Sequence, residues 1–458
     1  MTVLADQLLD PAQRPLADVL IEITNLTTGT SATIRSGRDG RWTANVPPGA
    51  YRVVHRAPNG ATLVSAVELV VPAGGGPYSL NGLGAPVRYA SIMGLGGGQG
   101  FTDRAQTDKT RAEQDLQLIA DVMPGGWVLF NFDWPEIEPT QGEQDWSDWQ
   151  WVIDTAHELG LRCCSAVLGT PSWANGGVGR FAPPLPQHLS AFCDYGAYMA
   201  DHGADALLAW NEPNNIEHFW RPGGVPTLDP VGYAELTIAL YARVKAANPD
   251  VPLIAGLTAP NGIPGQRPID FWTSIMNVPG FAESYDFPGH HPYQFSLNYG
   301  PTTEAPWNAC LQTRDLWQLQ VDRGRTDPFW LTEYGATTDG SLPRLPGSRQ
   351  IPEELSAVWT AQYHEAFARM ESEGVGIDVR IQYAISDNGP MSSTDEQDHF
   401  GQVRYDRSEK PQLAVIRAQA AARRDAPPAP TPPPPPPPED PPVSQLYDTA
   451  VLDTAIYA

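Results

Sequence analysis

The chain has 458 residues, of which 41% are hydrophobic and 18% are charged, so it holds enough apolar residues for the cores of two or three domains. Its 29 basic and 53 acidic residues give a net charge of −24 at pH 7, which repels nucleic-acid phosphates and anionic lipid headgroups. We therefore expect no nucleic-acid partner.

The apolar segments and the cysteines indicate which classes of protein this chain does not belong to. No stretch approaches the roughly 18 uninterrupted apolar residues of a membrane span, so we expect none. Residues 1–6, Met-Thr-Val-Leu-Ala-Asp, lack the basic and apolar regions of a signal peptide, so we expect no export by the Sec pathway. The four cysteines show no CxxC spacing, and we interpret them as small buried hydrophobes rather than disulfide or zinc ligands.

Short runs of alternating apolar and polar residues occupy the first part of the chain, separated by Gly, Asn, Asp and Pro. They lie at 16–23, 31–35, 41–46, 51–55 and 61–71. This rhythm is typical of a small antiparallel β-sandwich, which we assign to residues 1–86. Within it, Gly40-Arg41-Trp42 and the segment Val-Pro-Pro-Gly-Ala-Tyr-Arg-Val at 46–53 resemble carboxypeptidase-regulatory-like domains over about residues 8–72. A generic hairpin with a Pro-Gly turn is the alternative interpretation.

From about residue 89 to residue 422, short apolar runs alternate with longer segments of helical period, which indicates β/α units around a parallel sheet. The apolar runs lie at 89–94, 127–132, 161–168, 206–210, 252–255, 285–293, 329–332 and 377–385. Amphipathic segments between them, such as 149–156 with Gly160 as C-cap, predict helices. Eight strands fit a (β/α)₈ TIM barrel, which we assign to residues 87–425. A doubly wound sheet is the competing fold, but no GxGxxG or Walker motif opens a helix after a strand.

The end of the chain is rich in proline. Residues 426–443 contain twelve prolines, seven of them in the unbroken run 432–438, and can form neither helix nor sheet ladder. We therefore predict a disordered Pro-rich linker and a short tail over 426–458. The tail holds the near-repeat Tyr-Asp-Thr-Ala-Val and Leu-Asp-Thr-Ala-Ile at 447–456, too short to bury a core, so it is a frayed end or a docking strand.

Two glutamates lie at the carboxyl ends of predicted strands. The fourth strand is followed by Asn211, Glu212 and Pro213, and the seventh is followed by Glu333. Barrel enzymes carry their reactive groups at these strand ends, so both carboxyls are expected on one face. Glycosidic bond cleavage needs such a pair, one acid to protonate the leaving oxygen and one carboxylate to attack or to activate water. Mutual repulsion and partial burial should hold one of them protonated near neutrality.

These motifs resemble the clan of retaining (β/α)₈ glycoside hydrolases whose acid/base follows Asn after strand four and whose nucleophile ends strand seven. The likeness is greatest to glycoside hydrolase family 39 and its relatives, because further segments match in family order. These segments are 134–142 with 145–146, 168–174, 210–214 with 219–220, 290–293, and 400–401 with 410–411. Two departures affect the sugar-binding shell. The usual strand-two arginine falls at Leu129 or Asn131, and the usual strand-eight tryptophan falls at Gln382-Tyr383.

The resemblance implies that Glu212 is the acid/base and Glu333 the nucleophile of a double displacement. It also implies that Asn211 bonds the sugar 2-hydroxyl, and that His291 and Tyr293 orient the acids or the substrate. Flat aromatic rings stack on sugars. The aromatic candidates for substrate binding, each with core packing as its alternative, are Trp134, Trp173, Trp220 and Tyr383. No cofactor is expected.

Two clusters resemble metal sites in composition. His290 and His291 adjoin Asp286, but alternate residues of a strand face opposite ways, so we expect no metal site there. The acidic loop near Asp395 follows the eighth strand, and its residues are compatible with calcium ligation or with a solvated loop.

The sequence therefore predicts a retaining glycoside hydrolase that acts on an oligo- or polysaccharide. The order of small β-domain, glycosidase barrel, polyproline segment and repeated tail resembles minor tail proteins of phages that infect actinobacteria. This implies host cell-envelope polysaccharide as substrate, the virion tail as location, and other tail proteins as partners through the N-terminal domain or the tail. A cytoplasmic or non-classically secreted glycosidase is a second interpretation. The alternative function is a glycan-binding adhesin with an idle barrel, against which the presence of both acids counts.

Overall fold

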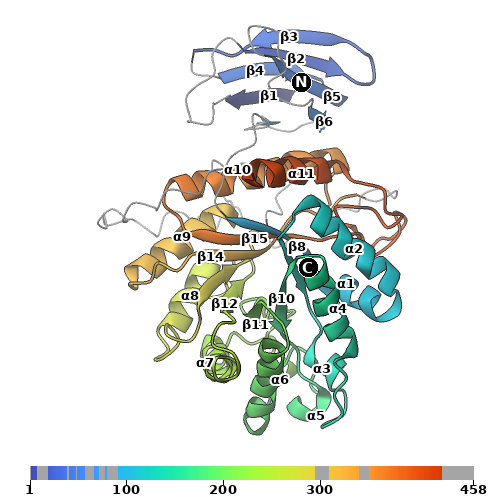
Figure 1. Ribbon diagram of the computed structural model, residues 1–458. Coiled ribbons are helices and arrows are strands. Elements are labelled where there is room, and N and C mark those ends of the chain that lie inside the picture. The colour runs from blue at the N-terminus through green and yellow to red at the C-terminus, as the bar shows by residue number, and fades with distance from the viewer. Residues whose placement is uncertain are drawn as a thin grey trace.

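The computed structural model describes residues 2–7, 19–38, 41–47, 49–56, 67–71, 78–79, 91–293, 309–339 and 350–424. Within these residues the chain forms a small β-domain and a closed barrel surrounded by helices (Figure 1). The predicted boundary at residue 86 and the predicted linker and tail at 426–458 lie outside the described residues, so they stay predictions.

The small domain is a sandwich of two sheets, as the alternating sequence predicts. Its strands are β1 (Thr2–Gln7), β2 (Leu20–Asn25), β3 (Ser31–Arg35), β4 (Arg41–Val46), β5 (Gly49–Arg56), β6 (Val67–Val71) and β7 (Tyr78–Ser79). One sheet has the order β3-β2-β5-β6 and the other the order β4-β1-β7. Ile21 on β2, Trp42 on β4 and Val53 on β5 are buried in one apolar cluster, because alternate residues of each strand face the same side.

Eight parallel strands close the barrel in the order β10-β11-β12-β13-β14-β15-β8-β9, and every neighbouring pair is parallel. The strands are β8 (Ile92–Gly97), β9 (Trp127–Phe130), β10 (Arg162–Val167), β11 (Ala206–Ala209), β12 (Leu253–Thr258), β13 (Phe287–His290), β14 (Phe329–Tyr334) and β15 (Ile377–Tyr383). Each overlaps one apolar run of the sequence, which confirms the predicted (β/α)₈ barrel. Nearly all of their residues are buried, as expected for strands enclosed by helices.

Helices follow the strands and cover the barrel. They are α1 (Gly98–Thr107), α2 (Lys109–Val122), α3 (Trp134–Ile137), α4 (Ser147–Glu158), α5 (Ser172–Asn175), α6 (Leu189–Asp201), α7 (Pro230–Ala247), α8 (Pro268–Met276), α9 (Ala309–Asp322), α10 (Glu353–Ser372) and α11 (Pro411–Arg424). α7 shows how sequence sets a helix start: the Asp229 carboxylate accepts the backbone N–H of Gly232 at 2.9 Å, and Pro230 occupies the first turn. No helix in the described part of the chain is long and apolar enough to cross a membrane.

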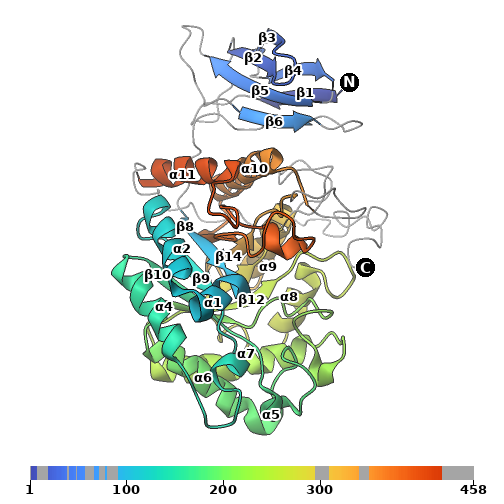
Figure 2. The ribbon, with the colours of Figure 1, turned by 90° about the vertical axis from the view of Figure 1, so that its right-hand side faces the viewer.

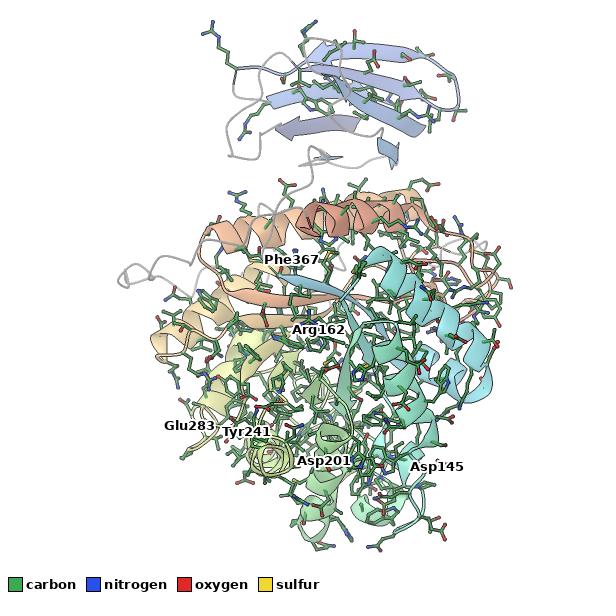
Figure 3. All side chains as sticks on the ribbon, viewed as in Figure 1. Asp145, Arg162, Asp201, Tyr241, Glu283 and Phe367 are labelled. Carbon is green, nitrogen blue, oxygen red and sulfur yellow. The ribbon has the colours of Figure 1, made fainter. Side chains whose placement is uncertain are left out.

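α10 packs on two sides, which joins the small domain to the barrel. Leu355, Val358 and Trp359 belong to the same apolar cluster as the core of the sandwich. Phe367, labelled in Figure 3, is buried and its ring lies 5.0 Å from that of Tyr334 on β14. In both views of the ribbon the small domain lies over α10 and α11, at the opposite end of the molecule from α5 and α6 (Figures 1 and 2).

A buried ion pair links the loop after β15 to the start of α11. The Lys410 ammonium contacts an Asp387 carboxylate oxygen at 2.7 Å, and it also donates to the Thr338 hydroxyl at 2.8 Å and to the His399 carbonyl at 3.0 Å. Both side chains have almost no exposed surface. Removing one partner of such a pair leaves the other charge buried and uncompensated.

We therefore predict that Lys410→Met lowers the free energy of unfolding by about 3–5 kcal/mol. Urea denaturation followed by circular dichroism measures the change. The double variant Lys410→Met with Asp387→Asn removes both charges and should recover a large part of the loss. Equal stability of the single variant and the wild type would contradict a structural role for this pair.

Candidate active site

Glu212 lies in a sharp turn immediately after β11. The strand ends at Ala209, and both Trp210 and Glu212 have positive φ, at 67° and 39°. Residues other than glycine rarely have a positive φ, and the backbone strain that it causes persists only where the surrounding structure enforces it. Trp210 is fully buried and its indole N–H donates to the Phe219 carbonyl, while the backbone N–H of Asn215 donates to the Glu212 carbonyl at 2.8 Å. The turn therefore holds Glu212 at the carboxyl end of the barrel.

Glu333 reaches the same face from β14, and His291 and Tyr293 reach it from the segment after β13. The Glu333 side chain is 16% exposed, between Thr332 and Tyr334, which are both buried. The backbone N–H of His291 donates to the Thr258 carbonyl of β12 at 3.0 Å, which fixes the segment that follows β13. The barrel thus brings four predicted site residues together at its carboxyl end: Glu212 after β11, His291 and Tyr293 after β13, and Glu333 on β14.

His291 lies between the two glutamates. Its Nδ1 is 3.1 Å from Oε1 of Glu212 and 3.8 Å from Oε2 of Glu333, and its Nε2 is 3.0 Å from the Thr332 hydroxyl. The ring is completely buried. The imidazole is therefore held at both nitrogens and contacts both carboxylates.

Each glutamate also has a donor of its own. The Tyr293 hydroxyl donates to Oε2 of Glu333 at 3.0 Å, and the side-chain amide of Asn215 donates to Oε2 of Glu212 at 3.0 Å. Sequence reasoning found Tyr293 but missed Asn215 and Thr332. Asn215 follows the Asn-Glu-Pro-Asn motif directly, and Thr332 precedes Glu333. Their closeness in sequence to the two acids is the feature from which both could have been predicted.

The separation of the acids limits their chemistry. One carboxylate oxygen of Glu212, one of Glu333 and a ring nitrogen of His291 all lie within 4.8 Å of one another. Carboxyl groups about 5–5.5 Å apart are typical of retaining glycosidases, whereas inverting enzymes place them about 6.5–9.5 Å apart to admit a water. The two glutamates therefore have the spacing for direct attack on a sugar by one of them.

Burial and mutual repulsion perturb the titration of this group. Burial raises the pKa of Glu333, the neighbouring Glu212 adds to the rise, and His291 and the Tyr293 hydroxyl oppose it. Burial lowers the pKa of His291, but the charge of Glu333 and the hydrogen bond to Glu212 outweigh it, so this pKa is raised. Burial and the Glu333 charge raise the pKa of Tyr293 well above its usual value, so the phenol stays a donor. Glu333 and His291 thus retain protons to higher pH than they would in water.

The structure corrects two of the expected sugar-stacking positions. Trp134 and Trp220 have no exposed surface, so neither presents a ring face to a substrate. The Trp134 indole N–H donates to Oε2 of Glu138 at 2.9 Å, and the Trp220 ring packs edge-on against Trp210 at 5.2 Å. The loops after β9 and β11, which carry these two tryptophans, pack against the barrel. Their rings therefore belong to the apolar core and not to a sugar-binding surface.

The remaining predicted residues lie near the carboxyl end of the barrel. Trp173 is half-buried and its indole N–H donates to the Glu138 carbonyl at 3.0 Å. Tyr383 is half-buried at the end of β15, and its ring lies so close to Gly98 that a Cβ there would approach it to 2.7 Å. Burial and the charge of Glu333 raise the pKa of Tyr383. Asn211 is buried in the Glu212 turn.

The two adjacent histidines point to different partners. His290 Nδ1 is 2.8 Å from the Thr258 carbonyl, whereas His291 faces Glu212. Asp286 instead accepts the backbone N–H of Leu253 at 2.7 Å and pairs with Lys245 at 2.8 Å. The side chains at 286, 290 and 291 therefore do not converge.

Two groups among the described residues have the spacing of metal ligands. One is Glu212, His291 and Glu333, and the other is His157, Cys163 and Asp205 at the opposite end of the barrel. In the second group Asp205 already accepts the Cys163 backbone N–H at 2.7 Å and contacts His157 at 2.9 Å. In the acidic loop, Asp395 accepts the backbone N–H of Gln397 at 2.9 Å, which is a turn interaction of a solvated loop.

Comparison with known proteins supports both units. Residues 7–77 match the carboxypeptidase regulatory-like domain family, in agreement with the expected 8–72. A GH5_18 enzyme from Streptomyces cattleya, solved with Manβ1-4GlcNAc, superimposes with a TM-score of 0.56 and 17% identity over 74% of this chain and 82% of its own. A related GH5_18 enzyme from Bifidobacterium longum gives 0.54 and 16% over 73% and 79%. A β-glucosidase from Exiguobacterium marinum gives 0.52 and 16% over 74% and 99%.

At these identities the likeness shows the barrel fold alone. No curated protein matches the chain. The similarity to glycoside hydrolase family 39 in particular therefore stays a prediction.

We predict that replacing either acid lowers the pKa of His291. Glu333→Gln and Glu212→Gln each remove a carboxylate that raises this pKa, so the lowering effect of burial should prevail. Titration of the ¹⁵N-labelled imidazole by NMR measures it. Glu217→Gln, which removes an exposed carboxylate from the same loop, is the matched control. An unchanged His291 pKa in both acid variants would show that the three groups do not interact.

Proposed function

We propose that the protein is a retaining glycoside hydrolase in which Glu333 is the nucleophile and Glu212 the acid/base. The observation that carries this proposal is the pair of glutamates held within 4.8 Å, each with its own hydrogen-bond donor, at the carboxyl end of a (β/α)₈ barrel. The similar solved structures are glycosidases of the same fold, among them a β-glucosidase. A β-linked sugar is therefore the proposed substrate.

In the first step the Glu333 carboxylate attacks the anomeric carbon while the bond from that carbon to the leaving oxygen breaks. The Glu212 carboxyl donates its proton to this oxygen, which leaves as an alcohol, and the sugar stays bound to Glu333 as an ester. In the second step the Glu212 carboxylate takes a proton from water, whose oxygen attacks the anomeric carbon and displaces Glu333. Two inversions at one carbon retain its configuration.

The surrounding residues support these roles by hydrogen bonding. Asn215 and His291 hold both oxygens of Glu212, so its carboxyl cannot rotate freely away from the leaving group. Tyr293 donates to Glu333 and stabilises its charged form, which is the form that attacks. Together they hold the reacting groups in position before substrate binds.

We also propose a host cell-envelope glycan as the natural substrate and the virion tail as the location. The support is the order of parts in the sequence, with a carboxypeptidase-regulatory-like domain before the barrel and a proline-rich segment after it. The N-terminal domain is then free to contact other tail proteins while the barrel meets the glycan. The alternative adhesin would bind the same glycan without turnover.

We predict that Glu212→Gln and Glu333→Gln slow hydrolysis in distinguishable ways. With aryl β-glycosides of a poor leaving group, each variant should lose about 10²–10⁴-fold in kcat. With a dinitrophenyl glycoside, which leaves without protonation, Glu212→Gln should keep most of its first-step rate and Glu333→Gln should not. Release of the dinitrophenolate is followed by absorbance, and NMR of the first-formed sugar checks retention. Glycan binding without turnover, equal in both variants and in Glu217→Gln, would favour the adhesin.

We further predict the pH dependence of the Tyr293→Phe variant. Attack requires charged Glu333, so kcat/KM falls as the pH drops through the pKa of this carboxyl. Burial raises that pKa, and the Tyr293 hydrogen bond opposes the rise. Tyr293→Phe should therefore move the acidic limb of kcat/KM to higher pH. Tyr405→Phe, at an exposed tyrosine, is the control and should leave the limb in place. A shift to lower pH in Tyr293→Phe would exclude this role.

A further inference from the structure

Exposed aliphatic side chains gather on loops at the carboxyl end of the barrel, the end that carries Glu212. Of the eight large hydrophobic residues that are exposed in the described part of the chain, six lie on the loops that follow β10 and β11, at the start of α7, or on the loop that follows β12. We name five of them the apolar rim: Val178, Val225, Leu228, Val231 and Ile263, which are 36–56% exposed. Single exposed hydrophobics are ordinary, but a concentration on neighbouring loops marks an interaction site.

The loops of the apolar rim touch one another. A Cβ on Gly224, which precedes Val225, would lie 2.6 Å from the Val178 carbonyl oxygen. A Cβ on Gly265, two residues after Ile263, would lie 3.0 Å from a methyl group of Leu228. The rim therefore lies on loops that contact one another and that follow three adjacent barrel strands.

Hydrogen bonds tie this surface to the turn that holds Glu212. The Asn214 side chain donates to the carbonyls of Ala259 and Gln266 at 2.8 Å each, and accepts the Ala259 backbone N–H at 2.8 Å. The backbone N–H of Arg221 donates to the Phe181 carbonyl at 3.0 Å, which joins the loop after β11 to that after β10. Glu212, Val225 and Leu228 thus belong to one loop that is braced on both sides.

We propose that the apolar rim binds the leaving group of the substrate, and that this group is an alkyl chain, as in a glycolipid. The inference rests on the proposed function, because the acid that protonates the leaving oxygen must lie next to the leaving group. The loop between β11 and α7 carries Glu212 and also carries Val225 and Leu228, so the acid and the rim lie at the same end of the barrel. Burial of methylene groups against these side chains removes apolar surface from water on both partners.

The chemistry of the rim favours an alkyl chain over a second sugar. Sugar-binding sites use flat aromatic rings together with hydrogen-bonding groups, whereas the rim residues are all branched aliphatics. The net charge of −24 disfavours an anionic lipid surface, so the fitting ligand is a neutral glycolipid. The small domain does not cover the rim, because it lies over α10 and α11, at the far end of the molecule from α5 in the loop that carries Val178 (Figure 2).

The test compares methyl, butyl, hexyl and octyl β-glucosides and β-mannosides, each below its critical micelle concentration. For the wild type, kcat/KM should rise about twofold per added methylene, since an open surface covers only part of each methylene. Equal kcat/KM for the methyl and octyl glycosides would overturn the proposal.

The matched variants are Leu228→Asn in the rim and Leu26→Asn in the small domain, two leucines of similar exposure, 36% and 39%. Both positions are exposed, so both variants should fold. Leu228→Asn should lower kcat/KM for the octyl glycoside by about three- to tenfold more than it lowers that of the methyl glycoside, whose leaving group is a single methyl. Leu26→Asn should change neither. An equal loss for both glycosides in Leu228→Asn would assign Leu228 to the architecture of the loop and overturn the proposal.

Binding of S-linked methyl and octyl glycosides, measured by calorimetry, separates this inference from the proposed function. The octyl compound could bind more tightly than the methyl compound and lose this advantage in Leu228→Asn, while no glycoside is hydrolysed. That outcome would support the alkyl-binding site and refute the hydrolase. Analytical ultracentrifugation tests whether a second copy of the chain covers the rim instead. A wild-type dimer that Leu228→Asn converts to a monomer, with no dependence on chain length, would assign the rim to a second copy of the chain.

Discussion

The site depends on holding two like charges close together. Glu212 and Glu333 are far apart in the chain, yet their carboxylate oxygens lie within 4.8 Å. Such proximity is unfavourable unless protons and donors compensate it. His291 contacts both carboxylates and lies between them. Asn215 donates a hydrogen bond to Glu212, and Tyr293 donates one to Glu333. Burial and the neighbouring Glu212 raise the pKa of Glu333, while His291 and Tyr293 oppose that rise, and the two carboxylates in turn raise the pKa of His291.

The rest of the architecture keeps these few groups in place. A closed barrel has no free edge, so β11, β13 and β14 cannot drift apart without breaking the parallel ladder. α10 packs on β14 from outside through Phe367 and receives the small domain on its other side. The buried Lys410–Asp387 pair fixes the loop after β15 against α11. The loops after β10, β11 and β12 are hydrogen-bonded to each other, which braces the loop that carries Glu212.

Much of this arrangement could be predicted from local pattern. The eight apolar runs coincide with the barrel strands, because buried parallel strands need continuous apolar residues. The two glutamates and His291 could be placed on one face, because every strand of a barrel ends there. By contrast, β1 has no strong alternation, and its place in the sandwich comes from pairing with β4 about 40 residues later. The stacking roles expected of Trp134 and Trp220 were wrong, because a loop aromatic can equally turn inward and complete the core.

The sequence by itself determined the two-part architecture and the identity of the candidate acids, since periodicity and strand-end position are local properties of the chain. Only the tertiary structure decided their separation, the contacts of His291 with both carboxylates, and the hydrogen bonds of Asn215 and Thr332. It also decided that the loops after β10, β11 and β12 contact one another and leave aliphatic side chains exposed. These properties depend on the closure of the barrel, which sets distances between residues that no local pattern relates.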